Sequence, residues 1–246
     1  MDKQPRRLSL AQQVPNLMTL AASCAGLTSI RFAVEGRPDQ AIALIILAAI
    51  LDGLDGRVAR MLRSESAIGA ELDSLADFLN FGAATGILVY LTVFGSGHSL
   101  GWVAVLIYVI CCVMRLARFN VDTKAPDPEA VPGWFTGVPS PAGAMLALMP
   151  IALDRTGISL PPILIAVWLV LVGWLLISRI RTPSLKLVRL RSDRMRFVVV
   201  GVIAVGAILF TWPWQALLAL DLAYLLVVLW SLRRGMRHRR RTTEAE

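Results

Sequence analysis

Long apolar runs, separated by short polar or charged segments, make up most of the chain. A membrane-spanning helix needs about 20 predominantly apolar residues, and breaks at Gly, Pro and charged residues divide the sequence into about eight such runs. They lie near residues 15–34, 40–60, 67–94, 100–119, 139–154, 161–179, 197–212 and 214–232. The pattern predicts an all-α fold, a polytopic membrane helix bundle of about eight transmembrane helices.

Two polar segments flank or interrupt this pattern. Pro5 to Val14 mixes Arg6 and Arg7 with leucines, which predicts either a short N-terminal interfacial helix lying along the membrane before the first span or a frayed terminus. The stretch from Asp122 to Gly137 holds three prolines and is predicted to be a loop.

Composition agrees with a membrane protein. The chain has 246 residues, of which 56% are hydrophobic and 17% are charged, whereas soluble domains carry about 25% charged residues. The formal net charge is +8, and all but three of the 25 Lys and Arg residues fall on the side of the predicted bundle that holds both termini. The exceptions are Arg31, Arg37 and Arg155. Because positive charge marks the cytoplasmic side, both termini are predicted to be cytoplasmic, and the charge gives no reason to expect a nucleic-acid partner.

Four aspartates stand in the second and third predicted spans. Asp52 and Asp55 are three residues apart, and Asp73 and Asp77 are four apart, so each pair shares one face of a helix. The short polar segment 61–66 links the two helices as an antiparallel pair, which puts the two aspartate pairs at similar depth. Four carboxylates repel one another strongly in a medium of low dielectric constant, and one or two divalent cations would offset this repulsion. Oxygen ligands favour Mg²⁺ or Mn²⁺ over Zn²⁺.

Small residues and one arginine accompany the aspartates. Gly53, Gly56, Ala59 and Gly69 leave little side chain on these helices, which suits either a ligand approaching the backbone or close helix–helix packing. Arg60 lies two turns beyond Asp52, where it either pairs with a phosphate or serves as a cytoplasmic topology charge.

The pattern Asp-x-x-Asp-Gly-x-x-Ala-Arg at residues 52–60, followed by Gly69, Asp73 and Asp77, resembles the signature of the CDP-alcohol phosphotransferase family. The resemblance implies that the four aspartates bind two divalent metal ions, which grip the pyrophosphate of a CDP-linked lipid. It also implies that Asp77 is the general base. The residues that would line the CDP pocket are Gly56, Ala59, Arg60 and Gly69.

Further motifs are similar to the phosphatidylserine synthase branch of that family. They are Pro15–Thr19, Glu71–Asp77, Arg115–Asn120 and Phe135–Pro141. The branch implies CDP-diacylglycerol as donor, L-serine as acceptor, and a homodimer in the cell inner membrane with a cytoplasmic active site. The chain departs from the branch at Asn80, which stands where a Ser is usual, and at Val138, which replaces a common Leu.

The apolar runs and the resemblance, which covers residues 15 to about 150, together predict a domain organisation. Residues 1–246 form a single membrane domain. Within it, 15–154 are the catalytic core, 161–232 are additional C-terminal transmembrane helices, and 233–246 are a basic cytoplasmic tail.

Several residues are candidates for substrate binding. Arg115 and Arg118 end the fourth span, where a guanidinium could bind the serine carboxylate, bind a phosphate, or only set the topology. Asn80 lies one turn beyond Asp77 and is a candidate for contact with the acceptor. The branch motifs add Asn120 and Ser140 as further acceptor-binding candidates. Asn16 and Thr19 open the first span, where they either cap the helix or contact the pyrophosphate.

Two alternative functions compete with transfer to serine. The same reaction with glycerol 3-phosphate, inositol phosphate or another alcohol would use the same metal site. A cation-coupled transporter would instead line an ion path with the aspartates. The transporter is disfavoured because such proteins usually have broken helices and repeat symmetry, and the sequence has neither.

Overall fold

The structure is a computed structural model that describes residues 10–95, 97–124, 134–178, 181–183 and 211–243. The seventh predicted span, 197–212, lies outside these residues except for its last two positions, as does the segment 5–9 of the predicted interfacial helix. The chain forms two compact units, Met1–Gly97 and His98–Glu246.

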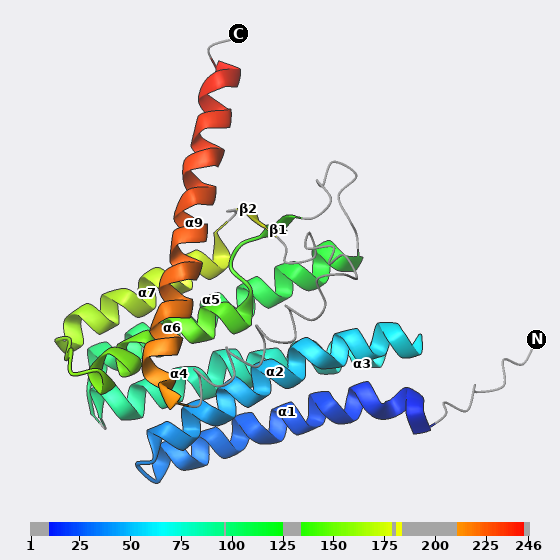
Figure 1. Cartoon of the computed structure of the whole chain (residues 1–246), viewed down its shortest axis with the longest axis horizontal. Helices are drawn as coiled ribbons and strands as arrows, with labels where there is room; N and C mark the ends of the chain where they lie inside the picture. The colour runs from blue at the N-terminus through cyan, green and yellow to red at the C-terminus, as the bar shows by residue number, and fades with distance from the viewer. Residues whose placement is uncertain (1–9, 96, 125–133, 179–180, 184–210, 244–246) are drawn as a thin grey trace, which may run out of the picture. The chain divides into compact units, whose positions relative to one another are not determined.

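The first unit begins with a helical hairpin of α1 (Leu10–Val34) and α2 (Pro38–Leu62), which lie side by side in Figure 1. Gly36 makes the turn with a φ of 70°, a conformation that favours glycine, and Pro38 starts α2 with a backbone angle suited to a first turn. Small side chains let the helices approach closely, and their core is Ala22, Ala25 and Ala48.

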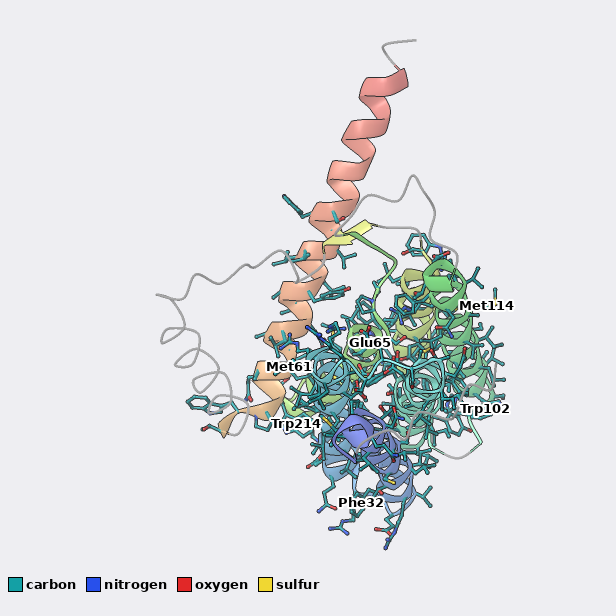
Figure 2. All side chains as sticks on the ribbon, turned by 90° about the vertical axis from the view of Figure 1, so that its right-hand side faces the viewer. Phe32, Met61, Glu65, Trp102, Met114 and Trp214 are labelled. Atoms are coloured by element: carbon teal, nitrogen blue, oxygen red, sulfur yellow. The ribbon has the colours of Figure 1, made fainter. Side chains whose placement is uncertain are left out.

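A second hairpin joins α2 to α3 (Ala67–Asp77) through the short link that carries Glu65, labelled in Figure 2. Arg63 ends α2 in the left-handed conformation with a φ of 50°. Ser66 caps α3, because its Oγ accepts a hydrogen bond of 3.0 Å from the backbone N–H of Gly69. The polar link predicted at 61–66 is therefore observed at 63–66, two residues shorter than expected.

The helix that starts with α3 continues through two π-helical segments. η1 (Phe78–Ala84), α4 (Thr85–Val89) and η2 (Tyr90–Phe94) follow in turn. Just after η1 the hydroxyl of Thr85, the first residue of α4, donates a hydrogen bond of 2.9 Å to the carbonyl of Asn80, five residues earlier. Asn80 itself is only 1% exposed, and its amide packs against Gly26 of α1.

The second unit consists of α5 (Ser99–Lys124), α6 (Ser140–Arg155), α7 (Pro162–Ile177) and α9 (Pro213–Thr243). α5 and α7 pack closely, since Gly173 of α7 lies against the Cys111 side chain of α5. The indole Nε1 of Trp168 in α7 donates a hydrogen bond of 2.8 Å to the carbonyl of Leu146 in α6.

A short antiparallel sheet in this unit departs from the all-α prediction. β1 (Trp134–Thr136) pairs with β2 (Arg181–Pro183), with Phe135 opposite Thr182. The expected loop 122–137 is thus wrong at both ends, because α5 runs to Lys124 and β1 closes the segment. β1 is a strand because its backbone pairs with β2, where Thr182 lies 47 residues after its partner Phe135. The local sequence pattern carries no signal of a contact at that distance along the chain.

Four helices of the described residues are long and apolar enough to cross a membrane, judged by length and composition. They are Gln13–Val34, Ala67–Phe94, Ser99–Thr123 and Pro213–Ser231. α7 is apolar but shorter. Large apolar side chains cover the outside of these helices; Trp102 and Met114 of α5, labelled in Figure 2, are 43% and 60% exposed. Such surfaces suit a lipid environment.

The contact between Gly26 and Asn80 predicts a specific stability effect. A Cβ at Gly26 would overlap the Asn80 amide, so Gly26→Ala is expected to destabilise the protein by about 1–3 kcal/mol. Thermal unfolding in detergent with a chelator present would measure this. Gly53→Ala is the matched control, because nothing lies within 4 Å of a Cβ there. The double variant Gly26→Ala/Asn80→Ala should recover part of the loss, and full additivity of the two changes would contradict the contact.

Candidate functional site

Three of the four predicted aspartates meet between α2 and α3. Asp52 and Asp55 come from α2 and Asp73 from α3, and one carboxylate oxygen of each lies within 4.8 Å of the others. Asp55 is 3% exposed, while the other two are partly buried. The antiparallel link predicted from sequence is what brings these carboxylates together.

The group fits a divalent cation. Three carboxylates at this separation supply only hard oxygen ligands, which suit Mg²⁺ or Mn²⁺. Their mutual repulsion needs a positive charge to offset it, and a bound divalent cation would supply that charge. Asp77, the last residue of α3, lies one turn after Asp73 and is outside the group of three. Its roles in metal binding and as a base stay predictions.

The first helix contributes Asn16 and Thr19 to this region. The Thr19 hydroxyl donates a hydrogen bond of 2.7 Å to Oδ2 of Asp55, and both residues are buried. Asn16 lies against α3, since its Oδ1 is 3.0 Å from the position of a Cβ on Gly69. Capping is wrong for both residues, because α1 begins at Leu10 and continues through Pro15. Pro15 cannot donate a backbone hydrogen bond, and α1 nevertheless continues through it. The residues before it include good helix formers such as Leu10, Ala11 and Gln12, which offset part of this loss.

The small residues of the motif have different surroundings. Gly69 faces Asn16 and Ser66, so close packing accounts for its lack of a side chain. Gly53 faces open space, and at Gly56 the nearest neighbour of a Cβ would be Nη1 of Arg60, at 3.7 Å. Arg60 therefore folds back along α2 over Gly56. Around these two glycines the backbone stays accessible to a ligand.

In the second unit the structure joins two of the predicted acceptor residues. Nη1 of Arg115 in α5 donates a hydrogen bond of 2.6 Å to Oγ of Ser140, the first residue of α6. Nη2 of Arg118 donates one of 2.7 Å to the carbonyl of Ile177 at the end of α7. That contact gives Arg118 a structural task that the sequence did not reveal. Asn120 lies on α5 and is partly buried.

Helix α9 carries a buried polar pair, Asp221 and Tyr224. Asp221 is 2% exposed, and an acid inside an apolar span is a functional suspect by default. Its Oδ2 and the hydroxyl of Tyr224, one turn later, are buried without a hydrogen-bond partner among the described residues.

Residues 12–179 of the chain match the model of the CDP-alcohol phosphatidyltransferase family. The chain therefore belongs to this family of phosphotransferases. The match begins in α1 and reaches past the end of α7, so it covers the aspartate helices and most of the second unit.

Proteins similar to this chain bear one shared name, CDP-diacylglycerol–serine O-phosphatidyltransferase. The one from Mycobacterium leprae is 48% identical over 179 residues, which are 71% of this chain and 59% of that protein. The one from Helicobacter pylori strain 26695 is 38% identical over 71% of this chain and 73% of that protein. The Bacillus subtilis protein is 31% identical over 70% and 91%. The mycobacterial proteins are thus matched over only about half of their length, 47% for Mycobacterium bovis.

The cluster of Asp52, Asp55 and Asp73 predicts that Asp73→Asn changes the melting temperature differently with and without bound metal. Two unit charges about 4 Å apart repel by about 4 kcal/mol at an effective dielectric constant of about 20. Asp73→Asn removes one charge from the group, so in chelator its melting temperature should rise, by about 2–4 °C per kcal/mol recovered. Adding Mn²⁺ should stabilise the unchanged protein and leave Asp73→Asn nearly unaffected.

Thermal unfolding in detergent, with chelator and across a Mn²⁺ titration, measures both effects. Glu71→Gln is the matched control, because Glu71 is exposed on the same helix and outside the group. Equal Mn²⁺ stabilisation of all three proteins would show that the group holds no metal.

Proposed function

We propose that this protein transfers the phosphatidyl group from CDP-diacylglycerol to L-serine, giving phosphatidylserine and CMP. The observation that carries the proposal is the group formed by Asp52, Asp55 and Asp73, located within the family match. The shared name of the similar proteins supports serine as the acceptor. Neither finding favours a transporter.

The donor is proposed to bind at the aspartate helices. Asp52, Asp55 and Asp73, with Asp77, would hold two divalent cations, Mg²⁺ or Mn²⁺. When bound, such ions neutralise pyrophosphate charge and act as Lewis acids. The open backbone at Gly53 and Gly56 leaves room for the cytidine and pyrophosphate, and Arg60 provides a guanidinium for a phosphate oxygen. Ala59, Gly69, Asn16 and Thr19 complete the proposed donor site.

Proton transfer is assigned to Asp77. Its carboxylate accepts the proton of the serine hydroxyl as the serine oxygen attacks the β-phosphorus of the donor. A bond from phosphorus to the serine oxygen forms, the bond to the CMP oxygen breaks, and CMP leaves with the electron pair. The position of Asp77, one turn from Asp73, keeps the base on the helix face that carries the carboxylate group.

Arg115 is the residue we favour for the acceptor. A guanidinium can bind the serine carboxylate through two parallel hydrogen bonds, and the contact with Ser140 fixes the side chain in advance. Arg118, Asn120 and Asn80 are proposed to complete acceptor binding. The contact of Arg118 with the Ile177 carbonyl gives it a second, structural role.

The proposed setting is a membrane of the cell, with about eight spans and both termini on the cytoplasmic side. The chain would form a single membrane domain, with the core at 15–154, further helices at 161–232 and a basic tail at 233–246. A homodimer in the inner membrane follows from the family resemblance. The donor is itself a lipid, so a site near the membrane surface lets it enter from the bilayer.

The direct test is CMP release by purified protein supplied with CDP-diacylglycerol and Mn²⁺. Serine, glycerol 3-phosphate, myo-inositol and inositol phosphate would be compared as acceptors. We expect release with L-serine alone, abolished by a chelator and restored by Mn²⁺. CMP release with only one of the other acceptors would support the proposed reaction and refute serine as the acceptor. No release with any acceptor would refute the proposed activity.

Asp77→Asn is the matched inactive variant in this assay, since it keeps the side-chain shape and removes the base. It should fold with an unchanged melting temperature in chelator and lose at least about 100-fold in kcat. A near-normal rate would move the base to another residue.

Arg115→Lys tests the acceptor assignment. Lysine keeps the charge but cannot make the two parallel hydrogen bonds, so KM for serine should rise about 10–100-fold, as expected from 1.5–3 kcal/mol for a charged hydrogen bond. KM for CDP-diacylglycerol should not change. Arg31→Lys, exposed and paired with Glu35, is the control. A rise in the donor's KM instead would assign Arg115 to a phosphate.

A further inference from the structure

Thr19 makes the hydrogen bond that ties the first helix to the carboxylate group. Its Oγ lies 2.7 Å from Oδ2 of Asp55, across 36 residues of sequence. Thr19 is 5% exposed and Asp55 is 3% exposed, so water does not compete freely for either group. A hydrogen bond to a charged acceptor in such surroundings is stronger than one between neutral groups.

The hydroxyl has a single hydrogen, and two acceptors lie near it. The second is the carbonyl of Pro15, at 3.1 Å, one turn earlier in α1. That carbonyl already accepts the backbone N–H of Thr19 in the regular pattern of an α-helix. Asp55 offers the shorter distance and the stronger acceptor, so the hydrogen belongs to the carboxylate.

A hydrogen bond to one oxygen of the Asp55 carboxylate fixes the rotation of that carboxylate about its bond to Cβ. Asp55 has two oxygens, and with Oδ2 held by Thr19 the side chain keeps one orientation toward Asp52 and Asp73. Residues that hold a ligating side chain in this way usually account for about 10–100-fold in metal affinity or activity. The packing of α1 against α2 through Ala22, Ala25 and Ala48 keeps the threonine in place.

We infer that Thr19 is a positioning residue of the metal site, which orients Asp55 before a cation binds. The inference rests on the proposed function, because it takes the carboxylate group to be a metal site. In this inference the main role of Thr19 is to orient Asp55, and not to contact the pyrophosphate directly. The role belongs to the hydroxyl and not to the methyl group, so serine can replace threonine and valine cannot.

The test is binding of Mn²⁺ to the purified full-length protein, measured by the electron paramagnetic resonance signal of the free ion, with no substrate present. Thr19→Val should weaken the affinity about 10–100-fold. Thr19→Ser should stay within about threefold of the unchanged protein, because it keeps the hydroxyl. Thr28→Val is the matched control, since the Thr28 hydroxyl donates its hydrogen bond to the Cys24 carbonyl in the same helix. It should bind Mn²⁺ normally.

The outcomes separate the two proposals. If the unchanged protein binds no Mn²⁺, or Asp73→Asn binds it equally well, the metal site itself is refuted. If the unchanged protein binds Mn²⁺ and Thr19→Val binds it with the same affinity, the role of Thr19 is refuted while the metal site stands. Equal weakening in Thr19→Ser and Thr19→Val would also refute it, because packing would then be the cause. Should Thr19→Val fail to fold in chelator, Thr19→Ala replaces it in the same comparison.

Discussion

Electrostatic repulsion among three carboxylates, brought within 4.8 Å of one another on largely apolar helices, is the constraint on which the first unit depends. Such a group can persist only if the helices are held together by other contacts and if a positive charge can enter. The first requirement is met by features outside the carboxylates. Small side chains allow α1 and α2 to pack closely, and the Ser66 cap fixes the start of α3. The second requirement is the one that the proposed divalent cation would meet.

The first helix therefore has a larger task than anchoring the chain in a membrane. Along one side it contacts Asp55 through Thr19, Gly69 through Asn16, and Asn80 through Gly26. These positions belong to α2, α3 and η1, so α1 touches every element that carries or extends the carboxylate group. A change in the tilt of α1 would be transmitted to the site through those contacts.

Features of the fold and the site could be predicted from the sequence where they depend on residues close together along the chain, and not where they depend on residues far apart. The facing aspartates followed from helical periodicity and the polar link, which are local signals, and the family signature depends on the same residues. The hydrogen bond between Thr19 and Asp55 could not be predicted, because it depends on the rotation of α1 against α2. The pairing of β1 with β2 was missed for a similar reason. The start of α1 was misjudged because Pro15 looked like a helix boundary, although a helix can continue through proline.

The π-helical segment η1 has a consequence for the direction in which side chains point along the candidate span Ala67–Phe94. A π turn closes with a hydrogen bond five residues back, so it takes in one residue more than an α turn. The stripe that begins with Asp73 and Asp77 is therefore interrupted at η1, and residues from Thr85 onward face directions that a continuous α-helical wheel would not give. The residues before and after η1 therefore follow two helical registers that are rotated relative to each other. The carboxylates of Asp73 and Asp77 lie in the half before η1, whereas the half after it directs Leu88 and Val89 into the interior of the unit.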